Sequence, residues 1–361
     1  MSQTIQPSSS QSTGLPKGRI EYIDALRGFT MILVVFQHVA TFCWHLGKGI
    51  SVHDYFIQVR MPMFFFISGF VMYKASVVWD WKQVKSFFKK KIPVQLISPF
   101  IFFCAFVYVS GYSFVESNFD ASKVGYWFTF VLFVYYVIYA TIRFFVRSNW
   151  SDLILLLVGC ALFAIVSPQI YKAIPIPGNV KQFLCMPNWY YFIFFVMGTL
   201  AKKHFSRLER VLDNTYLLAV CILVFFLVNV FIDAIPVNDR IIRHLLSFPG
   251  LVILFSFFRI NRHSLRKETV VGRTLQYIGK RTLDIYLIHF FLIPKQLKFI
   301  TVFTDHPMPI IEAAVSLFVA ALIIAACLLI GNIIRLSPFL AHWVFGAKYP
   351  AKQPTDHAEN H

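Results

Sequence analysis

The stretch Tyr22-Ile-Asp24-Ala-Leu-Arg27-Gly-Phe-Thr-Met-Ile-Leu-Val-Val-Phe-Gln37-His38 decides the fold class of this chain. It opens an apolar run long enough to cross a bilayer as a helix, yet ionisable side chains stand inside it. Arg27 and His38 are separated by about three helical turns, so they share one face of the helix, roughly 16 Å apart along its axis. Asp24 lies one turn before Arg27 on the same side, and we expect the two to pair.

The composition of the whole chain indicates that lipid is its solvent. Hydrophobic residues make up 57% of the 361 residues and charged residues 14%, whereas soluble domains have about 25% charged residues. We therefore predict an all-α, polytopic integral membrane protein with about ten transmembrane helices. The ten apolar runs are centred near Val34, Ile67, Phe102, Val134, Leu157, Phe195, Val224, Leu251, Tyr286 and Ile323.

The basic residues predict the orientation. If the N-terminus is inside, Lys and Arg are about three times as frequent in the inward segments as in the outward ones, so both termini are expected to be cytoplasmic. The Ser/Gln-rich residues 1–18 are predicted to be a disordered cytoplasmic tail, 19–340 the transmembrane domain and 341–361 a second cytoplasmic tail. The net charge of +17 is spread between the apolar runs rather than gathered on one face, which argues against nucleic acid as a partner.

Arg27 and His38 each have a structural explanation as well as a functional one. Arg27 stands near the predicted inner boundary, where its side chain could simply snorkel to the interface. His38 is expected near mid-membrane, where snorkelling cannot explain it. It could be a satisfied packing residue, but intramembrane ionisable residues are more often functional. We favour a function for His38 and leave both interpretations open for Arg27.

Four further polar side chains lie in later spans. Arg60 is in the outer half of the second span, where outward snorkelling is a fair alternative. Ser68-Gly69 permits close packing against the first helix, and Ser68 could also make a polar contact. In the ninth span Asp284 is about one turn inside the membrane and His289 is deeper. A buried acid is expected to have a basic partner, and Lys280, four residues earlier, is the simplest candidate.

This set of residues favours a substrate cavity over a simply packed bundle. His38 could act as a general base that takes the proton of a hydroxyl and makes it a nucleophile toward an activated acyl group. Lys89-Lys90-Lys91 could hold the phosphates of an anionic donor, although the positive-inside rule alone is the simpler explanation. Motifs for NTP hydrolysis, nicotinamide redox chemistry and zinc hydrolysis are missing from the sequence. The six cysteines lie singly, so no metal site is expected.

Four segments, in this order, resemble the membrane acyltransferase-3 family. Arg27, ten intervening residues and His38 are similar to the family's Arg-x10-His signature. The other three are Arg60-Met-Pro-Met-Phe-Phe-Phe-Ile-Ser68-Gly69-Phe70, Trp189-Tyr-Tyr-Phe-Ile-Phe-Phe-Val-Met-Gly198 and Gly279-Lys-Arg-Thr-Leu-Asp-Ile-Tyr286-Leu-Ile-His289. The resemblance extends from about Glu21 to Leu336. Where the family often has an arginine pair, this chain has Lys89-Lys90-Lys91, which keeps the charge but not the bidentate fork.

The resemblance implies a bacterial integral-membrane O-acyltransferase of the inner (cytoplasmic) membrane, in the stand-alone form without an appended esterase-like domain. Residues 19–340 would be the acyltransferase domain, which transfers an acyl group, expected to be acetyl, from cytoplasmic acyl-CoA to a sugar hydroxyl of a cell-surface or periplasmic glycan. No bound cofactor is expected, since acetyl-CoA would be a co-substrate. The expected partners are the acyl-CoA donor, a glycan or lipid-linked sugar acceptor and the lipid bilayer.

Residue roles follow from the resemblance together with the polar positions above. The predicted catalytic residues are His38, Arg27 and Asp24. The predicted substrate-binding residues are Arg60, Ser68, Asp284, His289, Lys90 and Lys91.

Two other functions stay open at this point. One is an exporter of a glycan or lipid-linked saccharide without acyl-transfer chemistry, which would not consume acyl-CoA. The other is a proton-coupled transporter that uses Asp284 and His289, whose uptake would follow the pH gradient and survive the loss of His38.

Overall fold

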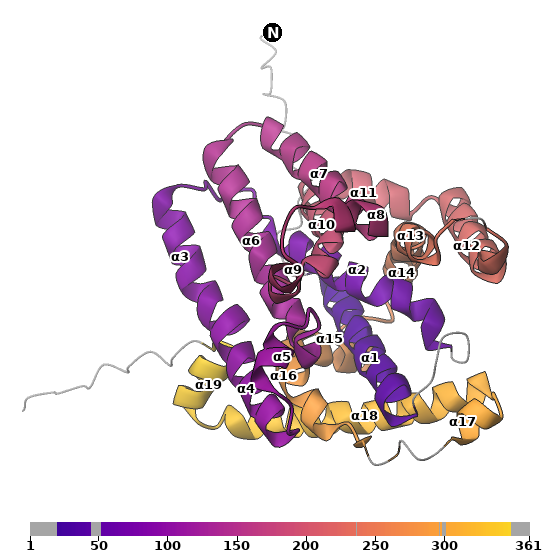
Figure 1. Ribbon diagram of the computed structural model, residues 1–361. Coiled ribbons are helices and arrows are strands. Elements are labelled where there is room, and N and C mark those ends of the chain that lie inside the picture. The colour runs from indigo at the N-terminus through magenta and orange to yellow at the C-terminus, as the bar shows by residue number, and fades with distance from the viewer. Residues whose placement is uncertain (1–19, 45–51, 236, 296, 298–300, 348–361) are drawn as a thin grey trace, which may run out of the picture.

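The computed structural model describes residues 20–44, 52–235, 237–295, 297 and 301–347 (Figure 1). Within these ranges the chain is helical and contains no strand, which confirms the all-α prediction. The predicted tail 1–18 lies outside the described residues, and so does the end of the predicted tail 341–361. The last helix, α19 (Pro338–Phe345), crosses the predicted domain boundary at 340.

The longer helices carry most of the bundle, and shorter helices and single turns connect them. The longer ones are α1 (Glu21–Cys43), α2 (His53–Met72), α3 (Trp81–Ile92), α4 (Ser98–Val109), α6 (Trp127–Phe145), α7 (Trp150–Phe163), α10 (Phe192–Lys203), α12 (Thr215–Val230), α14 (Ser247–Ile260), α15 (Val270–Lys280), α16 (Thr282–Leu292) and α18 (Pro309–Ile334). The shorter ones are α5 (Phe114–Asn118), α8 (Pro168–Ala173), α9 (Gly178–Phe183), α11 (Phe205–Leu212), α13 (Asp239–Leu245) and α17 (Val302–Asp305). The remaining turns are the π-helix η1 (Pro93–Ile97) and the 3-10 helices η2 (Lys123–Gly125), η3 (Ala164–Val166), η4 (Met186–Tyr191) and η5 (Ile232–Ala234).

The helices confirm a multi-pass membrane protein. Six described helices are long and apolar enough to cross a bilayer, and the pair α11–α12, bent by 68°, would make a seventh if it counts as one span. Each of the ten predicted centres falls within a helix. However, α7, α10 and α16 are shorter than the roughly 20 residues that a straight crossing needs. The count of ten spans and the cytoplasmic termini therefore stay predictions.

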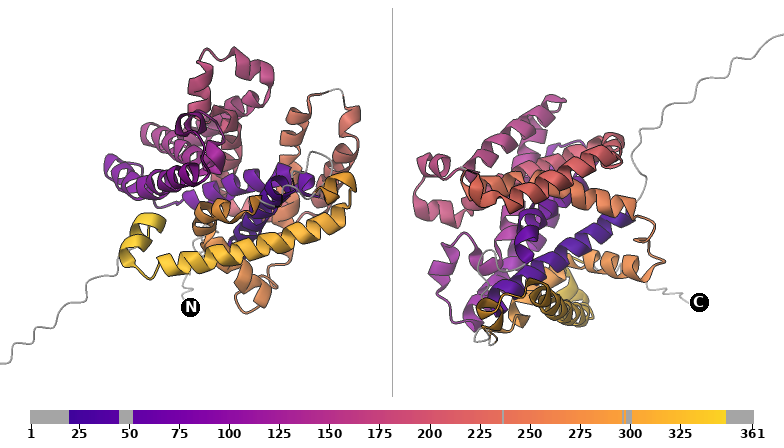
Figure 2. Two further views of the ribbon diagram at one scale, coloured as in Figure 1. Left: turned by 60° about the horizontal axis from the view of Figure 1, so that its bottom comes forward. Right: turned by 90° about the vertical axis from the view of Figure 1, so that its right-hand side faces the viewer.

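Helices α1 and α2 lie in the interior and α18 runs along one edge (Figures 1 and 2). The sequence of α1 gives the reason, because ionisable side chains such as Arg27 and His38 are costly toward lipid, whereas the more apolar α18 can face it. In the most apolar part of α1, 61% of the residues are buried, compared with 28% in the corresponding part of α18. Helix α1 packs against α2, α14, α15, α16 and α18. The helix that carries Arg27 and His38 is thus the central one.

Two pairs of glycines bring helix backbones into direct contact. A Cβ atom on Gly28 of α1 would lie 2.0 Å from the Leu275 carbonyl oxygen of α15, and one on Gly279 of α15 would lie 2.1 Å from the Asp24 carbonyl oxygen of α1. A Cβ atom on Gly69 of α2 would lie 1.9 Å from the Phe195 carbonyl oxygen of α10, and Gly198 meets α2 in the same way. The prediction that Gly69 packs against the first helix is therefore wrong. Gly69 does permit a close helix crossing, but the crossing is with α10. No pattern in the sequence near Gly69 indicates that α10 is its neighbour.

The crossing of α2 and α10 gives a first prediction. Gly69→Ala is expected to lower the stability of the protein by about 1–3 kcal/mol, because the added methyl group meets a backbone carbonyl that cannot rotate away. The change would be measured as the midpoint of thermal unfolding in detergent. Gly178→Ala is the matched control, since nothing lies within 4 Å of a Cβ atom at Gly178. Equal midpoints for the two variants would contradict the packing described here.

The predicted inward segment before the third span is itself helical. Asp80 caps α3 by accepting a hydrogen bond from the Gln83 N–H (2.7 Å), and α3, η1 and α4 form one candidate span, Trp81–Val109. Pro93 has no N–H to donate, and the chain continues through a wider π turn in which the Ser98 N–H donates to the Pro93 carbonyl. Because α3 is a helix, Lys90 and Lys91 are held in fixed positions rather than on a loop.

Candidate active site

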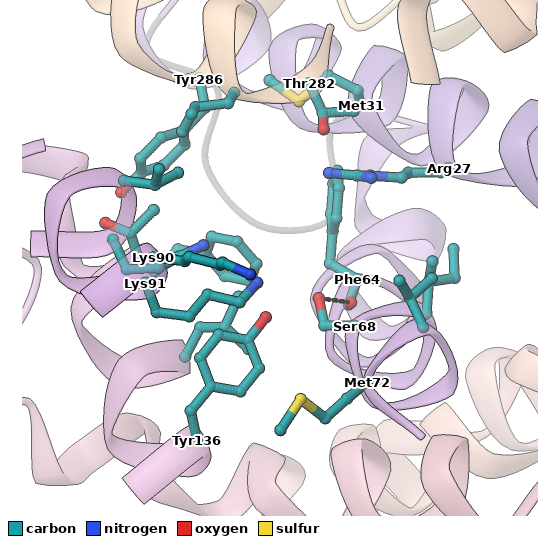
Figure 3. Close-up of a pocket in the computed structure, with 18 of the residues that line it drawn as sticks. Arg27, Met31, Phe64, Ser68, Met72, Lys90, Lys91, Tyr136, Thr282 and Tyr286 are labelled. Carbon is teal, nitrogen blue, oxygen red and sulfur yellow. Dashed lines mark hydrogen bonds between the residues drawn. The ribbon is translucent and has the colours of Figure 1, made fainter. Parts of the chain in front are cut away.

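A cavity of about 540 Å³ lies inside the bundle, between α1, α2, α3, α6 and α16 (Figure 3). This volume is in the range of about 300–1,000 Å³ that is usual for small-molecule sites. Its wall combines apolar side chains, such as Met31 and Phe64, with a few polar ones. The cavity is therefore a candidate substrate site rather than a packing gap.

Two histidines from different helices meet in this cavity. His38 of α1 and His289 of α16 both line it, and their rings stack with centroids 5.3 Å apart and an angle of 28° between the planes. Phe290 packs against both rings, with centroids 4.9 Å from His38 and 4.1 Å from His289. Phe42 stacks on His38 at 5.5 Å. Aromatic packing thus holds the two imidazoles in place.

The hydrogen bonds of the two rings differ. His289 is fully buried, and its Nδ1 lies 2.9 Å from the Ile285 carbonyl oxygen and 3.0 Å from that of Tyr286. Its Nε2 and the Nδ1 of His38 are buried and have no hydrogen-bond partner in the described part of the chain. Buried polar atoms without a partner are uncommon in native proteins and call for an explanation.

The cavity is cationic. Arg27, Lys74, Lys90 and Lys91 line it, and none of the described residues in its wall is acidic. Arg27 from α1 and the two lysines from α3 point into the space from opposite sides (Figure 3). Lys91 Nζ also lies 4.7 Å from the centre of the Tyr136 ring, a cation–π contact that orients it. Four positive charges without a carboxylate among them favour an anionic ligand.

The sequence-predicted residues divide into two groups. Arg27, His38, Ser68, Lys90, Lys91 and His289 all line the cavity. The position of Arg27 favours a role in the cavity over snorkelling alone. Ser68 donates a hydrogen bond to the Phe64 carbonyl oxygen of its own helix (2.8 Å), so its hydroxyl has a partner already. Lys90 and Lys91 lie in the cavity wall, a position that the positive-inside rule does not require.

Asp24, Arg60 and Asp284 are not among the residues that line the cavity. Asp24 is buried in the first turn of α1, and its predicted pairing with Arg27 stays a prediction. Arg60 is half-buried, lies within electrostatic reach of His38 and has a buried Nη1 without a hydrogen-bond partner among the described residues.

Asp284 has a basic partner, as predicted, but the partner is not Lys280. Arg335 at the end of α18 binds both carboxylate oxygens, at 2.7 and 2.9 Å, and Arg281 lies 3.2 Å from one of them. Lys280 is exposed. The correction has a simple cause: Arg335 is distant in the sequence, and its planar fork matches a carboxylate better than a lysine does.

This ion pair gives a second prediction. Asp284→Ala is expected to lower stability by about 3 kcal/mol, because it removes one partner of a mostly buried pair and leaves the guanidinium of Arg335 against the bundle. Lys280→Ala, an exposed neighbour, is expected to stay within about 0.5 kcal/mol of the parent. Thermal unfolding and donor binding would be measured for both variants. Loss of binding by folded Asp284→Ala protein would favour the predicted substrate-binding role, and an unchanged melting midpoint would contradict the structural one.

Several polar residues of the wall were not predicted from the sequence, among them Gln95 and Thr129. Gln95 in the π turn η1 and Thr129 in α6 both line the cavity, and the side-chain oxygen of Gln95 is buried without a hydrogen-bond partner among the described residues. The available signal was a glutamine inside the apolar run after Lys91. Thr129 gives little signal, because threonine is common in apolar helices.

Fold and site together define a multi-pass membrane protein with an internal cationic cavity that contains a histidine pair. Residues 20–331 match the model of the acyltransferase-3 family, described as an acyltransferase domain. The chain therefore belongs to this family, as the sequence motifs predicted. Neither a curated protein nor a solved structure matches it.

Proposed function

We propose that the protein is an integral-membrane O-acyltransferase that moves an acyl group, expected to be acetyl, from cytoplasmic acyl-CoA to a sugar hydroxyl of a cell-surface or periplasmic glycan. The observation that carries the proposal is a single cavity that joins four cations to two histidines. Acyl-CoA has the matching shape: phosphates at one end and a thioester at the other. Family membership supports acyl transfer in general.

In the proposed reaction the donor enters past the basic mouth. Arg27, Lys90 and Lys91 hold its phosphates, and the thioester lies near His38. His38 takes the proton of the acceptor hydroxyl while the oxygen attacks the thioester carbonyl carbon. The new C–O bond forms, the C–S bond breaks, and the proton passes to the leaving thiolate to give the free thiol of CoA. No bound cofactor takes part in these steps.

The inner membrane of a bacterium is the proposed location. Donor supply from the cytoplasm requires that the mouth lined by Lys74, Lys90 and Lys91 faces inward, which agrees with the positive-inside rule. A purified, reconstituted protein should release CoA from acetyl-CoA only when an acceptor is present. If the protein neither bound acetyl-CoA nor released CoA, with or without an alcohol substrate, the exporter alternative would be favoured instead.

A further inference from the structure

The tautomer of His289 is fixed by its own helix. Nδ1 faces two backbone carbonyl oxygens, those of Ile285 and Tyr286. A carbonyl oxygen can only accept a hydrogen bond, so Nδ1 must carry the proton. A neutral imidazole then has its lone pair on Nε2, at the ring edge that points away from α16. The neutral form is the one expected here, because none of the described residues that line the cavity is an acid that could pair with an imidazolium.

The lone pair on Nε2 has no partner in the described chain, although the atom is buried. A buried hydrogen-bond acceptor without a hydrogen-bond donor is unfavourable, and a bound ligand can supply the missing N–H or O–H group. The thioester cannot supply it, since its carbonyl and sulfur atoms only accept. The alcohol that receives the acyl group can supply this hydrogen bond, because each of its hydroxyls has one proton to donate.

A single hydroxyl cannot serve both histidines. In the proposed reaction the nucleophilic hydroxyl gives its only proton to His38. A hydrogen bond to Nε2 of His289 must therefore come from a second hydrogen-bond donor on the same alcohol substrate. The two rings stack at 5.3 Å, so Nε2 of His289 and a ring nitrogen of His38 can both be reached by neighbouring groups on one small molecule. A hydroxyl on the adjacent carbon fits this requirement.

We propose that His289 is a positioning residue that selects acceptors with a second hydrogen-bond donor next to the reactive hydroxyl, such as the vicinal diol of a sugar. The neighbouring hydroxyl donates to Nε2 of His289 and turns the reactive hydroxyl toward His38. This inference rests on the proposed function and names the acceptor chemistry within it.

The test compares two small acceptors with the purified, reconstituted full chain and acetyl-CoA. Ethylene glycol has a second hydroxyl donor, whereas 2-methoxyethanol has an ether oxygen in its place and is otherwise similar. The release of CoA thiol measures transfer to each. The parent protein is expected to prefer the diol by roughly tenfold in kcat/KM, the effect of one hydrogen bond in a site that excludes water.

Two variants separate the Nε2 contact from the packing of the ring. His289→Asn keeps an N–H group where Nδ1 was and so keeps the bond to the helix carbonyls, but it has no group at the position of Nε2. We expect its preference for the diol to fall to about one, because the kcat/KM for ethylene glycol falls more than that for 2-methoxyethanol. His289→Gln puts an amide near the position of Nε2 and is expected to restore part of the preference.

The outcomes are distinct. Transfer by the parent protein without a preference for the diol would overturn the role of His289 while leaving the proposed function intact, and this result needs no variant to fold. Equal loss of transfer to both alcohols in folded His289→Asn protein would overturn it too, since His289 would then be a general base. No transfer to either alcohol would count against the proposed function and against this inference with it.

Discussion

His38→Ala is expected to reduce acyl transfer by a factor of about 10²–10⁴ while the amount of protein in the membrane stays the same. The variant removes the proton acceptor for the attacking hydroxyl. His289 cannot replace it without losing the second contact to the acceptor. Since His38 is only partly buried and faces the cavity, we expect the bundle to tolerate the smaller side chain.

The measurement is the release of CoA by purified protein, together with mass spectrometry of the surface glycans of cells that carry each variant. His263→Ala is the control, because His263 is exposed and lies outside the cavity wall. Acetyl-CoA binding by His38→Ala protein should be close to that of the parent, because the cations at the mouth are intact. Full transfer activity in a folded His38→Ala protein would refute the assignment of the base.

Neutralising the lysines of α3 is expected to weaken donor binding strongly. Lys90→Gln together with Lys91→Gln should raise the Kd for acetyl-CoA by about tenfold to a thousandfold, because a hydrogen bond to a charged group contributes about 1.5–3 kcal/mol and neighbouring contacts need not add. The parent protein should bind more weakly as salt is added, and the double variant should show a smaller dependence on salt.

Lys89→Gln is the matched control for this experiment. Lys89 precedes the pair on the same helix and is exposed, but it does not line the cavity. Its removal changes the net charge of α3 and leaves the site unchanged. If Lys89→Gln weakened binding as much as removal of Lys90 or Lys91 does, a general surface charge would explain the effect and the proposed phosphate contacts would be wrong.

The sequence predicted the parts of the site that depend on helical spacing. Arg27 and His38 were placed on one face, and both line the cavity because α1 is one uninterrupted helix from Glu21 to Cys43. The meeting of His38 with His289 could not be predicted in the same way. It depends on how α1 and α16 pack, and spacing within one helix contains no information on that.

Long-range partners account for the errors. Asp284 binds Arg335, 51 positions later, whereas we expected the nearby Lys280. Gly69 faces Phe195 of α10 rather than α1. Both contacts join segments that no periodic pattern links, so the type of interaction was predictable and the partner was not.

The number of spans stays a prediction for a related reason. Composition identifies an apolar run, but it does not show where the helix breaks. Helix α16 has 11 residues because the chain breaks at Arg281, between α15 and α16. The run around Tyr286 therefore looks like a full span in the sequence and is a short helix in the structure.

The central claim is that one cavity holds acyl-CoA with its phosphates at the basic mouth and its thioester at the two histidines. The most direct test is photolabelling of the reconstituted protein with an acyl-CoA analogue that carries a diazirine on the acyl group. Labelled peptides identified by mass spectrometry should map to the cavity-facing parts of α1 and α16, near His38 and His289, and excess acetyl-CoA should prevent the labelling. Labelling at other helices, or labelling that acetyl-CoA does not displace, would contradict the claim.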